Sequence, residues 1–100
     1  MTRINTCVSM SDVRENIDRI DKDLVKLLSE RSRYVKKAAE FKKDEQDVRA
    51  PARVEDVVSK VRELSQNEGF NPNITEQIYR TMIDCFINME LEEFEGQNNN

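Results

Sequence analysis

The sequence contains no histidine and no tryptophan, and only two cysteines, two glycines and two prolines among its 100 residues. Without histidine, neither Ser–His nor Cys–His nucleophilic catalysis is available. Cys7 and Cys85 are far apart in the sequence and supply no Cys/His cluster, so no zinc or other metal site is expected. The scarcity of glycine and proline is typical of long helices with few connections. We expect a protein without cofactors whose chemistry depends on charged side chains.

An excess of positive charge and a long apolar run are also missing. The formal net charge is −4, which argues against nucleic-acid binding, since nucleic-acid-binding proteins usually carry a basic face. No apolar run approaches the ~20 residues of a membrane-spanning helix, so no membrane association is expected. The N-terminus has no apolar signal region, so we expect a cytoplasmic location.

Apolar residues recur at steps of three and four, which predicts an all-α fold with three helices. The first helix is expected over residues 11–44, with Ser11 or Asp12 as its N-cap, and a polar loop follows over 44–50. Pro51 suits the first turn of a second helix over 51–67, which Gly69 would cap, and a third helix opens at residues 71–73. One helical domain over 11–95 would then lie between a flexible leader, 1–10, and a disordered tail, 96–100.

The length of the first helix bears on quaternary structure. A helix over residues 11–44 would be about 50 Å long at ~1.5 Å per residue. A compact domain of this size has a radius of gyration of about 13 Å, so two shorter helices cannot cover the whole apolar stripe of such a rod. A second copy of the chain can cover it, which predicts an intertwined homodimer.

Two cations interrupt the apolar stripe of the first helix. At steps of three and four, this stripe runs through Leu24, Leu28, Arg31, Val35, Ala38 and Lys42. A charge on a core-facing stripe is unfavourable unless an anion meets it. Arg31 and Lys42 therefore predict a buried cationic pocket for a small polyanion.

Three further charged residues border the predicted stripes. Glu90 lies between Phe86 and Phe94 on the third helix, and Arg14 and Arg53 lie near the starts of the first and second helices. Each also has a structural interpretation. The arginines can be surface residues whose stems lie on apolar surface, and Lys42 can interact with a helix C-terminus. Glu90 can pair internally with Lys42 or Arg31. Together, however, guanidinium forks and an ammonium group form the set that binds a dicarboxylate.

This pattern resembles the all-helical (type II) chorismate mutase family. The resemblance covers about residues 11–94. It rests on Arg14-Glu15-Asn16-Ile17-Asp18-Arg19-Ile20-Asp21, on Leu27-Leu28-Ser29-Glu30-Arg31, and on Lys42, Arg53 and Glu90 in the same order and spacing. The stretches 34–42 and 50–54 look most similar to the isochorismate-pyruvate lyase branch of that family.

The resemblance implies a fold of three helices per chain in an intertwined dimer with shared active sites. It implies that Arg31, together with Arg14 of the other chain, binds the substrate carboxylates. Lys42 would reach the ether oxygen and a carboxylate, Arg53 would close over the ligand, and Glu90 would hydrogen-bond the ether oxygen. Chorismate rearranges to prephenate in one pericyclic step that needs no nucleophile, metal or proton transfer. The enzyme has to hold a compact conformer and stabilise charge on that oxygen.

Three departures from the resemblance affect the predicted reaction. Family mutases often carry Gln where this chain has Glu90. A carboxylate cannot donate a hydrogen bond, so our hypothesis is that Glu90 acts in its protonated form and that activity rises as the pH falls. Typical mutases also place Glu where this chain has Val54, and a small polar residue where it has Phe86. These last two departures favour the lyase branch or a weak mutase.

Four readings of the sequence therefore remain. The first is a chorismate mutase (an isomerase of aromatic amino acid biosynthesis), and the second is an isochorismate-pyruvate lyase that forms salicylate. The third is a non-catalytic domain that binds a dicarboxylate or only dimerises. The fourth is a plain helical dimer with an internal Arg31–Glu90 salt bridge. Under the fourth reading, substitution of Arg31 or Lys42 would mainly change stability.

Overall fold

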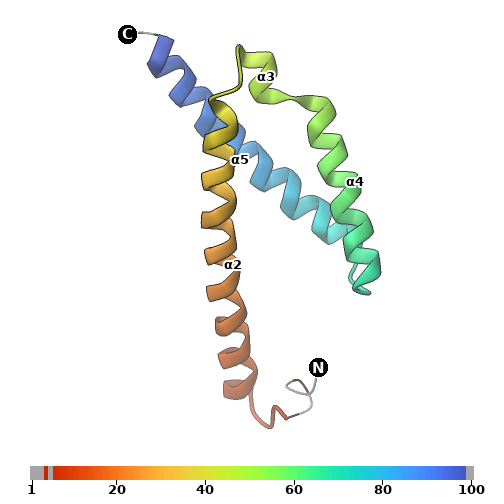
Figure 1. The fold of residues 1–100 in the computed structure, drawn as a ribbon. Helices are drawn as coiled ribbons and strands as arrows, with labels where there is room; N and C mark the ends of the chain where they lie inside the picture. The colour runs from red at the N-terminus through yellow and green to blue at the C-terminus, as the bar shows by residue number, and fades with distance from the viewer. Residues whose placement is uncertain (1–3, 5, 99–100) are drawn as a thin grey trace. The chain divides into compact units, whose positions relative to one another are not determined.

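The computed structural model describes residue 4 and residues 6–98. The helices are α2 (Met10–Ala39), α3 (Glu45–Arg49), α4 (Pro51–Asn67) and α5 (Pro72–Asn98) (Figure 1). No strand occurs in this described part of the chain, which confirms the all-α prediction. The chain forms two units, one ending at Tyr34 and one beginning at Val35.

α2 begins at Met10, one residue before the predicted start at residue 11. Ser9 Oγ accepts a hydrogen bond from the backbone N–H of Asp12 at 3.1 Å. Asp12 Oδ2 in turn accepts one from the N–H of Val8 at 3.0 Å. These reciprocal bonds satisfy N–H groups that have no partner inside the helix. The predicted N-cap at Ser11 or Asp12 was therefore wrong, because Ser9 and Asp12 form the cap together.

α2 also ends earlier than predicted, at Ala39 rather than near residue 44. The N–H groups of Glu40, Phe41 and Lys42 bond to carbonyl oxygens three residues back, at 3.2, 3.0 and 3.2 Å. Such bonds tighten the last turn and end the helix. Lys42 therefore lies beyond α2, and the prediction that it belongs to the helical stripe was wrong.

The segment predicted as a polar loop over 44–50 contains the short helix α3. Asp44 has an extended backbone and its side chain accepts a hydrogen bond from the N–H of Asp47 at 2.9 Å. Val48 is the buried residue of α3, and α3 contacts α5. Ala50, in the left-handed region at φ 37° and ψ 60°, ends α3 and immediately precedes Pro51 of α4.

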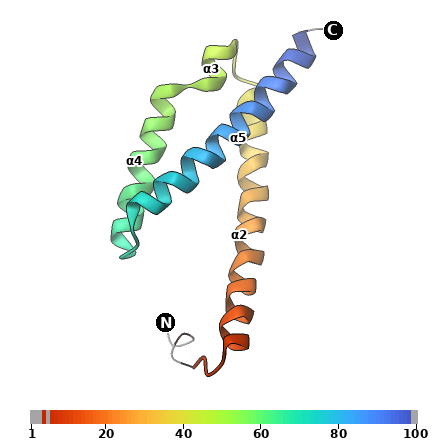
Figure 2. The same cartoon turned by 180° about the vertical axis from the view of Figure 1, so that it is seen from behind.

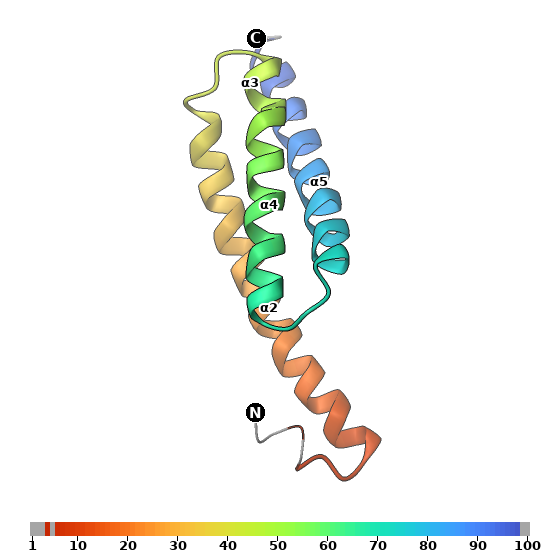
Figure 3. The ribbon, with the colours of Figure 1, turned by 90° about the vertical axis from the view of Figure 1, so that its right-hand side faces the viewer.

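α4 and α5 form an antiparallel hairpin, which Figure 2 shows from behind and Figure 3 from the side. The predicted glycine cap of α4 is confirmed: Gly69 has φ +69°. The N–H groups of Gly69 and Phe70 bond to the carbonyls of Gln66 and Ser65 at 3.1 and 2.9 Å, a Schellman motif. Asn71 Oδ1 then accepts the N–H of Asn73 at 2.9 Å at the start of α5.

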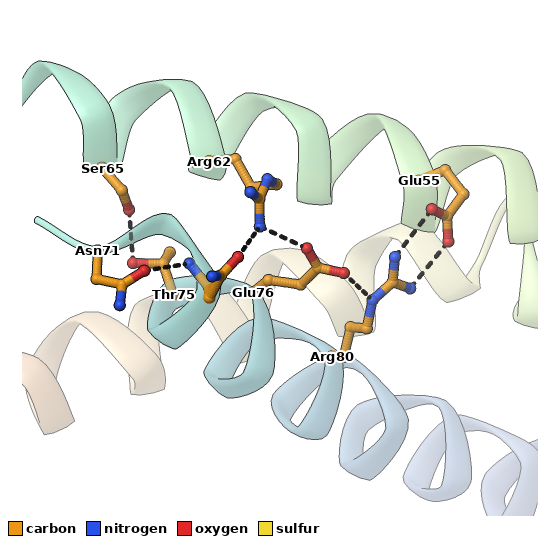
Figure 4. Close-up of polar contacts among 8 residues, drawn as sticks. Glu55, Arg62, Ser65, Asn71, Thr75, Glu76 and Arg80 are labelled. Carbon is orange, nitrogen blue, oxygen red and sulfur yellow. Dashed lines mark hydrogen bonds and ion pairs between the residues drawn. The ribbon is translucent and has the colours of Figure 1, made fainter.

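Apolar contacts and an ion network hold this hairpin together. The buried apolar residues are Val48, Val58, Val61 and Ile83. On the surface, Arg80 of α5 binds both carboxylate oxygens of Glu55 of α4 at 2.9 Å and Glu76 at 2.8 Å (Figure 4). Glu76 also accepts from Arg62 of α4 at 2.7 Å. The bidentate contact fixes the register of α4 against α5.

α2 carries several large apolar side chains that are exposed. α2 has 30 residues, none of them buried, and is about 45 Å long at ~1.5 Å per residue. Ile17 is 50% exposed, Leu24 52% and Leu28 42%. Exposed apolar surface of this extent is typical of interaction sites.

The predicted leader and tail remain predictions. They fall partly on residues 1–3, 5 and 99–100, which lie outside the described residues. The backbone of α5 extends to Asn98, beyond the predicted domain end at residue 95.

Candidate functional site

Lys42 and Glu90 form the centre of the candidate site. Lys42 Nζ lies 2.9 Å from Glu90 Oε2, joining the segment after α2 to α5. The Glu90 side chain is only 4% exposed and that of Lys42 is 22% exposed. Lys42 is one of the two internal partners, Lys42 and Arg31, that the sequence offered for Glu90. A buried carboxylate is tolerable because an ammonium group satisfies it.

Lys42 also lines an open hollow of about 490 Å³, a size suited to a small molecule. Arg53, from the first turn of α4, lines it as well, so the structure brings together two of the cations that the sequence identified. Phe41, Lys42, Gln46, Asp47, Ala50, Pro51, Ala52 and Arg53 line this hollow. Most of them precede α4, so the turn that ends α2, together with α3 and Ala50, shapes the hollow.

Arg53 is turned along α4 towards a carboxylate. Its Nη1 lies 2.7 Å from Asp56 Oδ2, and Lys60 Nζ lies 3.2 Å from the same oxygen. Lys60 first, and then Arg53, hold the pKa of Asp56 below its usual value through hydrogen bonds to the carboxylate. The Arg53 side chain is 64% exposed, so it has room to change rotamer and meet a bound anion.

Arg14 and Arg31, the other two predicted cations, belong to the unit that ends at Tyr34. Arg14 is exposed in the first turns of α2, and Arg31 is partly buried further along the same helix. Their participation with Lys42 in one site remains a prediction.

Sequence reasoning missed the contribution of α3 to the hollow. Gln46 and Asp47 line it, yet both stand in a stretch read as a loop. The sequence does contain a signal for the start of α3, because Asp44 and Asp47 have the spacing of a capping box. A second hollow, of about 440 Å³, lies between α4 and α5 and includes Arg49, Glu55 and Asp84. With two carboxylates and one guanidinium, it suits a dicarboxylate less well than the first.

Metal-ligating clusters and membrane-spanning helices are both missing from the described residues. These residues contain no group of three or more His, Cys, Asp or Glu side chains that could hold a metal ion. They also contain no helix long and apolar enough to cross a membrane.

The helices and the cationic hollow define an all-helical protein with a candidate site for a small anion. Residues 13–91 match the family model described as chorismate mutase type II. This match covers more than half of the chain, which therefore belongs to the chorismate mutase type II family. The family resemblance drawn from the sequence is confirmed.

Individual relatives include both kinds of enzyme. The chain is 35% identical over 81 residues to an isochorismate pyruvate lyase of Pseudomonas aeruginosa, covering 81% of this chain and 80% of the relative. It is 27% identical over 93 residues to a chorismate mutase of Methanocaldococcus jannaschii, covering 89% and 94%. A bifunctional chorismate mutase/prephenate dehydratase of Aquifex aeolicus is 28% identical over 85 residues, which cover 81% of this chain but 24% of that longer protein.

Proposed function

We propose that this protein is a chorismate mutase-type pericyclic enzyme that converts chorismate to prephenate. The observation that carries the proposal is the Lys42 ammonium, which is held at 2.9 Å by the buried Glu90 on the edge of a hollow that Arg53 also lines. The family membership and the two relatives with chorismate mutase in their names support this reaction.

The proposed mechanism depends on position and charge. Lys42 has three N–H donors, and one of them is used by Glu90. The other donors are available for the ether oxygen and a carboxylate of the substrate. As the ether C–O bond breaks and the new C–C bond forms, negative charge builds on that oxygen. One charged donor there is worth about 3 kcal/mol of transition-state stabilisation, by analogy with an oxyanion hole.

Arg14 and Arg31 would bind the substrate carboxylates, and Arg53 would close over the ligand. These roles follow from the family pattern, and the exposure of Arg53 supports its part. A guanidinium fork makes two parallel hydrogen bonds to a carboxylate, so it fixes orientation as well as charge. Holding the dicarboxylate in its compact conformer would supply much of the acceleration.

The second candidate reaction is the elimination of pyruvate from isochorismate to give salicylate. It is favoured by Val54, which stands where typical mutases carry Glu. The 35% identity to an isochorismate pyruvate lyase fits this reaction without favouring it over the first. The same cations would bind isochorismate, since it is also a dicarboxylate enol ether.

One assay separates the candidates. The purified protein is supplied with chorismate and, separately, with isochorismate, and prephenate is measured against salicylate plus pyruvate. A higher kcat/KM for chorismate conversion to prephenate supports the mutase reaction. A higher kcat/KM for isochorismate conversion to salicylate means that the protein is a lyase. If neither substrate is converted, only the dicarboxylate-binding and structural readings survive, and calorimetry with chorismate distinguishes those two.

We also propose that the protein works as an intertwined homodimer in which each site takes Arg14 from the partner chain. The exposed stripe of α2 supports this assembly, because a second copy presents an equally apolar face. With 11.7 kDa per chain, a dimer is distinguishable by sedimentation. Leu28→Asp should yield monomers, whereas Lys26→Asp, at an exposed polar position of α2, should leave the dimer intact. A monomeric wild-type protein would refute the assembly.

Mixing two inactive variants tests the shared site. In a heterodimer of Arg14→Ala and Lys42→Ala chains, one site would have both residues intact. Random exchange of subunits should then restore about a quarter of the wild-type activity. If Arg14 acted within its own chain, both sites of the heterodimer would be defective and no activity would return.

The expected cytoplasmic location remains a prediction.

A further inference from the structure

Asp47 occupies an unexpected place for a carboxylate. It lines the same hollow as Lys42 and Arg53, where the proposed substrate would bring two negative charges. A carboxylate without another role there would repel that substrate. Asp47 has a role: its Oδ2 accepts a hydrogen bond from the backbone N–H of Lys43 at 2.9 Å.

This bond reaches back to the segment that carries Lys42. The N–H of Lys42 is bonded to the carbonyl of Ala39 at 3.2 Å, and the next N–H, of Lys43, is bonded to Asp47. The backbone on both sides of the Lys42 side chain is therefore fixed. A long side chain can only present its ammonium group reproducibly if its Cα is held in this way.

α3 in turn fixes the position of Asp47. Asp44 Oδ1 accepts the N–H of Asp47 at 2.9 Å, and Asp44 O accepts the N–H of Val48 at 3.2 Å. Val48 is 4% exposed, and α3 contacts α5, the helix that carries Glu90. The carboxylate of Asp47 is thereby tied to the element that holds the partner of Lys42.

We propose that Asp47 is a positioning residue, which fixes the backbone at Lys43 and thereby presents the Lys42 ammonium to Glu90 and to the substrate. The inference rests on the function proposed above. It predicts that the hydrogen-bond acceptor of Asp47 is needed to position Lys42, while the negative charge of Asp47 weakens substrate binding. Asp47→Asn keeps an acceptor and removes the charge, whereas Asp47→Ala removes both.

The kinetic test compares these two variants with Glu45→Ala, using whichever substrate the wild-type protein converts. Glu45 also stands in the first turn of α3, but it pairs with Arg49 at 3.1 Å and does not bond to the 42–43 segment. We expect Asp47→Ala to lower kcat about tenfold through misplacement of Lys42. Asp47→Asn should keep kcat within about twofold and lower KM, and Glu45→Ala should leave both parameters within about twofold.

A second readout is independent of activity. Amide hydrogen exchange at Lys43, followed by NMR, should be slow in the wild-type protein and in Asp47→Asn but at least about tenfold faster in Asp47→Ala. Equal loss of kcat in Asp47→Asn and Asp47→Ala, or no loss in Asp47→Ala, would overturn the inference while leaving the proposed function in place. If the wild-type protein converts neither substrate, the proposed function and the catalytic part of this inference both fail. Unchanged exchange at Lys43 in Asp47→Ala would refute the positional part.

Discussion

Lys42 and Glu90 stand 48 positions apart in the sequence, and their side chains meet at 2.9 Å with Glu90 only 4% exposed. This ion pair has two separable consequences. It neutralises a carboxylate that burial would otherwise make unfavourable, and it aims an ammonium group at the hollow that Arg53 shares.

Comparison of the single variant Lys42→Met with the double variant Lys42→Met/Glu90→Met separates the two consequences. Lys42→Met should lower the free energy of unfolding by about 1–3 kcal/mol, because it leaves the Glu90 carboxylate without its partner. Lys42→Met/Glu90→Met should recover most of that loss. Both proteins should lose at least about 100-fold in kcat. Lys43→Met, which removes the neighbouring exposed charge, serves as the control. Stability lost and regained without any change in kcat would make the pair purely structural.

Glu90→Gln tests whether the carboxyl group donates to the ether oxygen. A protonated carboxyl can donate and a carboxylate cannot. Under this hypothesis, the amide of Glu90→Gln replaces one donor with another, so kcat of this variant should stay within about threefold of the wild-type value. A kcat raised at least about tenfold in Glu90→Gln would mean that the wild-type group does not donate to the ether oxygen, and it would contradict the hypothesis.

The Arg53–Asp56 pair predicts a variant with tighter substrate binding. Arg53 has to leave Asp56, 2.7 Å away, before it can bind a substrate carboxylate. Because an exposed pair of this kind is weak, removing the charge of Asp56 should have a small effect, and Asp56→Asn should lower KM by up to about fivefold. Glu63→Gln makes the same charge change elsewhere on α4 and should leave KM unchanged. An unaltered KM in Asp56→Asn would mean that Asp56 does not compete with substrate for Arg53.

The Glu55–Arg80–Glu76 contacts predict how stability responds to acid. Hydrogen bonds from Arg80 hold the pKa of Glu55 and of Glu76 below their usual values, and Arg62 contributes further at Glu76. Stabilisation from a lowered folded-state pKa is fully present above the unfolded-state pKa, and it disappears as the pH falls through the folded-state pKa.

Arg80→Met should therefore unfold at a lower temperature than the wild-type protein at neutral pH. This difference should shrink below about pH 5 and vanish once both carboxylates are protonated. Thermal unfolding from about pH 7 to about pH 2 checks this, with Lys36→Met, at an exposed position of α2, as the control. A difference between Arg80→Met and the wild-type protein that stays constant over this range would exclude the ion network as its cause.

The sequence predicted the elements whose signals are local. Pro51 and Gly69 mark the two ends of α4, and both were placed correctly because each acts through its own backbone preference. The early end of α2 was missed, since residues 40–43 continue the helical spacing and the bonds that end the helix leave no compositional mark. α3 was missed because a five-residue helix shows no periodicity.

The candidate site was predictable by residue type but not by geometry. Glu90 could be given a cationic partner, either Lys42 or Arg31, because all three residues interrupt apolar patterns, but the sequence could not choose between the two cations. Arg62, Glu76 and Arg80 could not be identified as a network, because their contacts depend on how α4 is registered against α5. On each helix separately, these residues read as ordinary solvent-exposed charges.

A single residue joins α3 to α4. Ala50, in the left-handed region, ends α3 and immediately precedes the first residue of α4. Inserting a residue there would separate the two bonds that Ala50 makes, from its N–H to the Gln46 carbonyl at 2.9 Å and from its carbonyl to the Val54 N–H at 3.1 Å. It would also displace Arg53 from the hollow while Val48 stayed anchored. Changes in loop length during evolution are therefore expected to avoid this junction, even though it lies at the surface where insertions are usually tolerated.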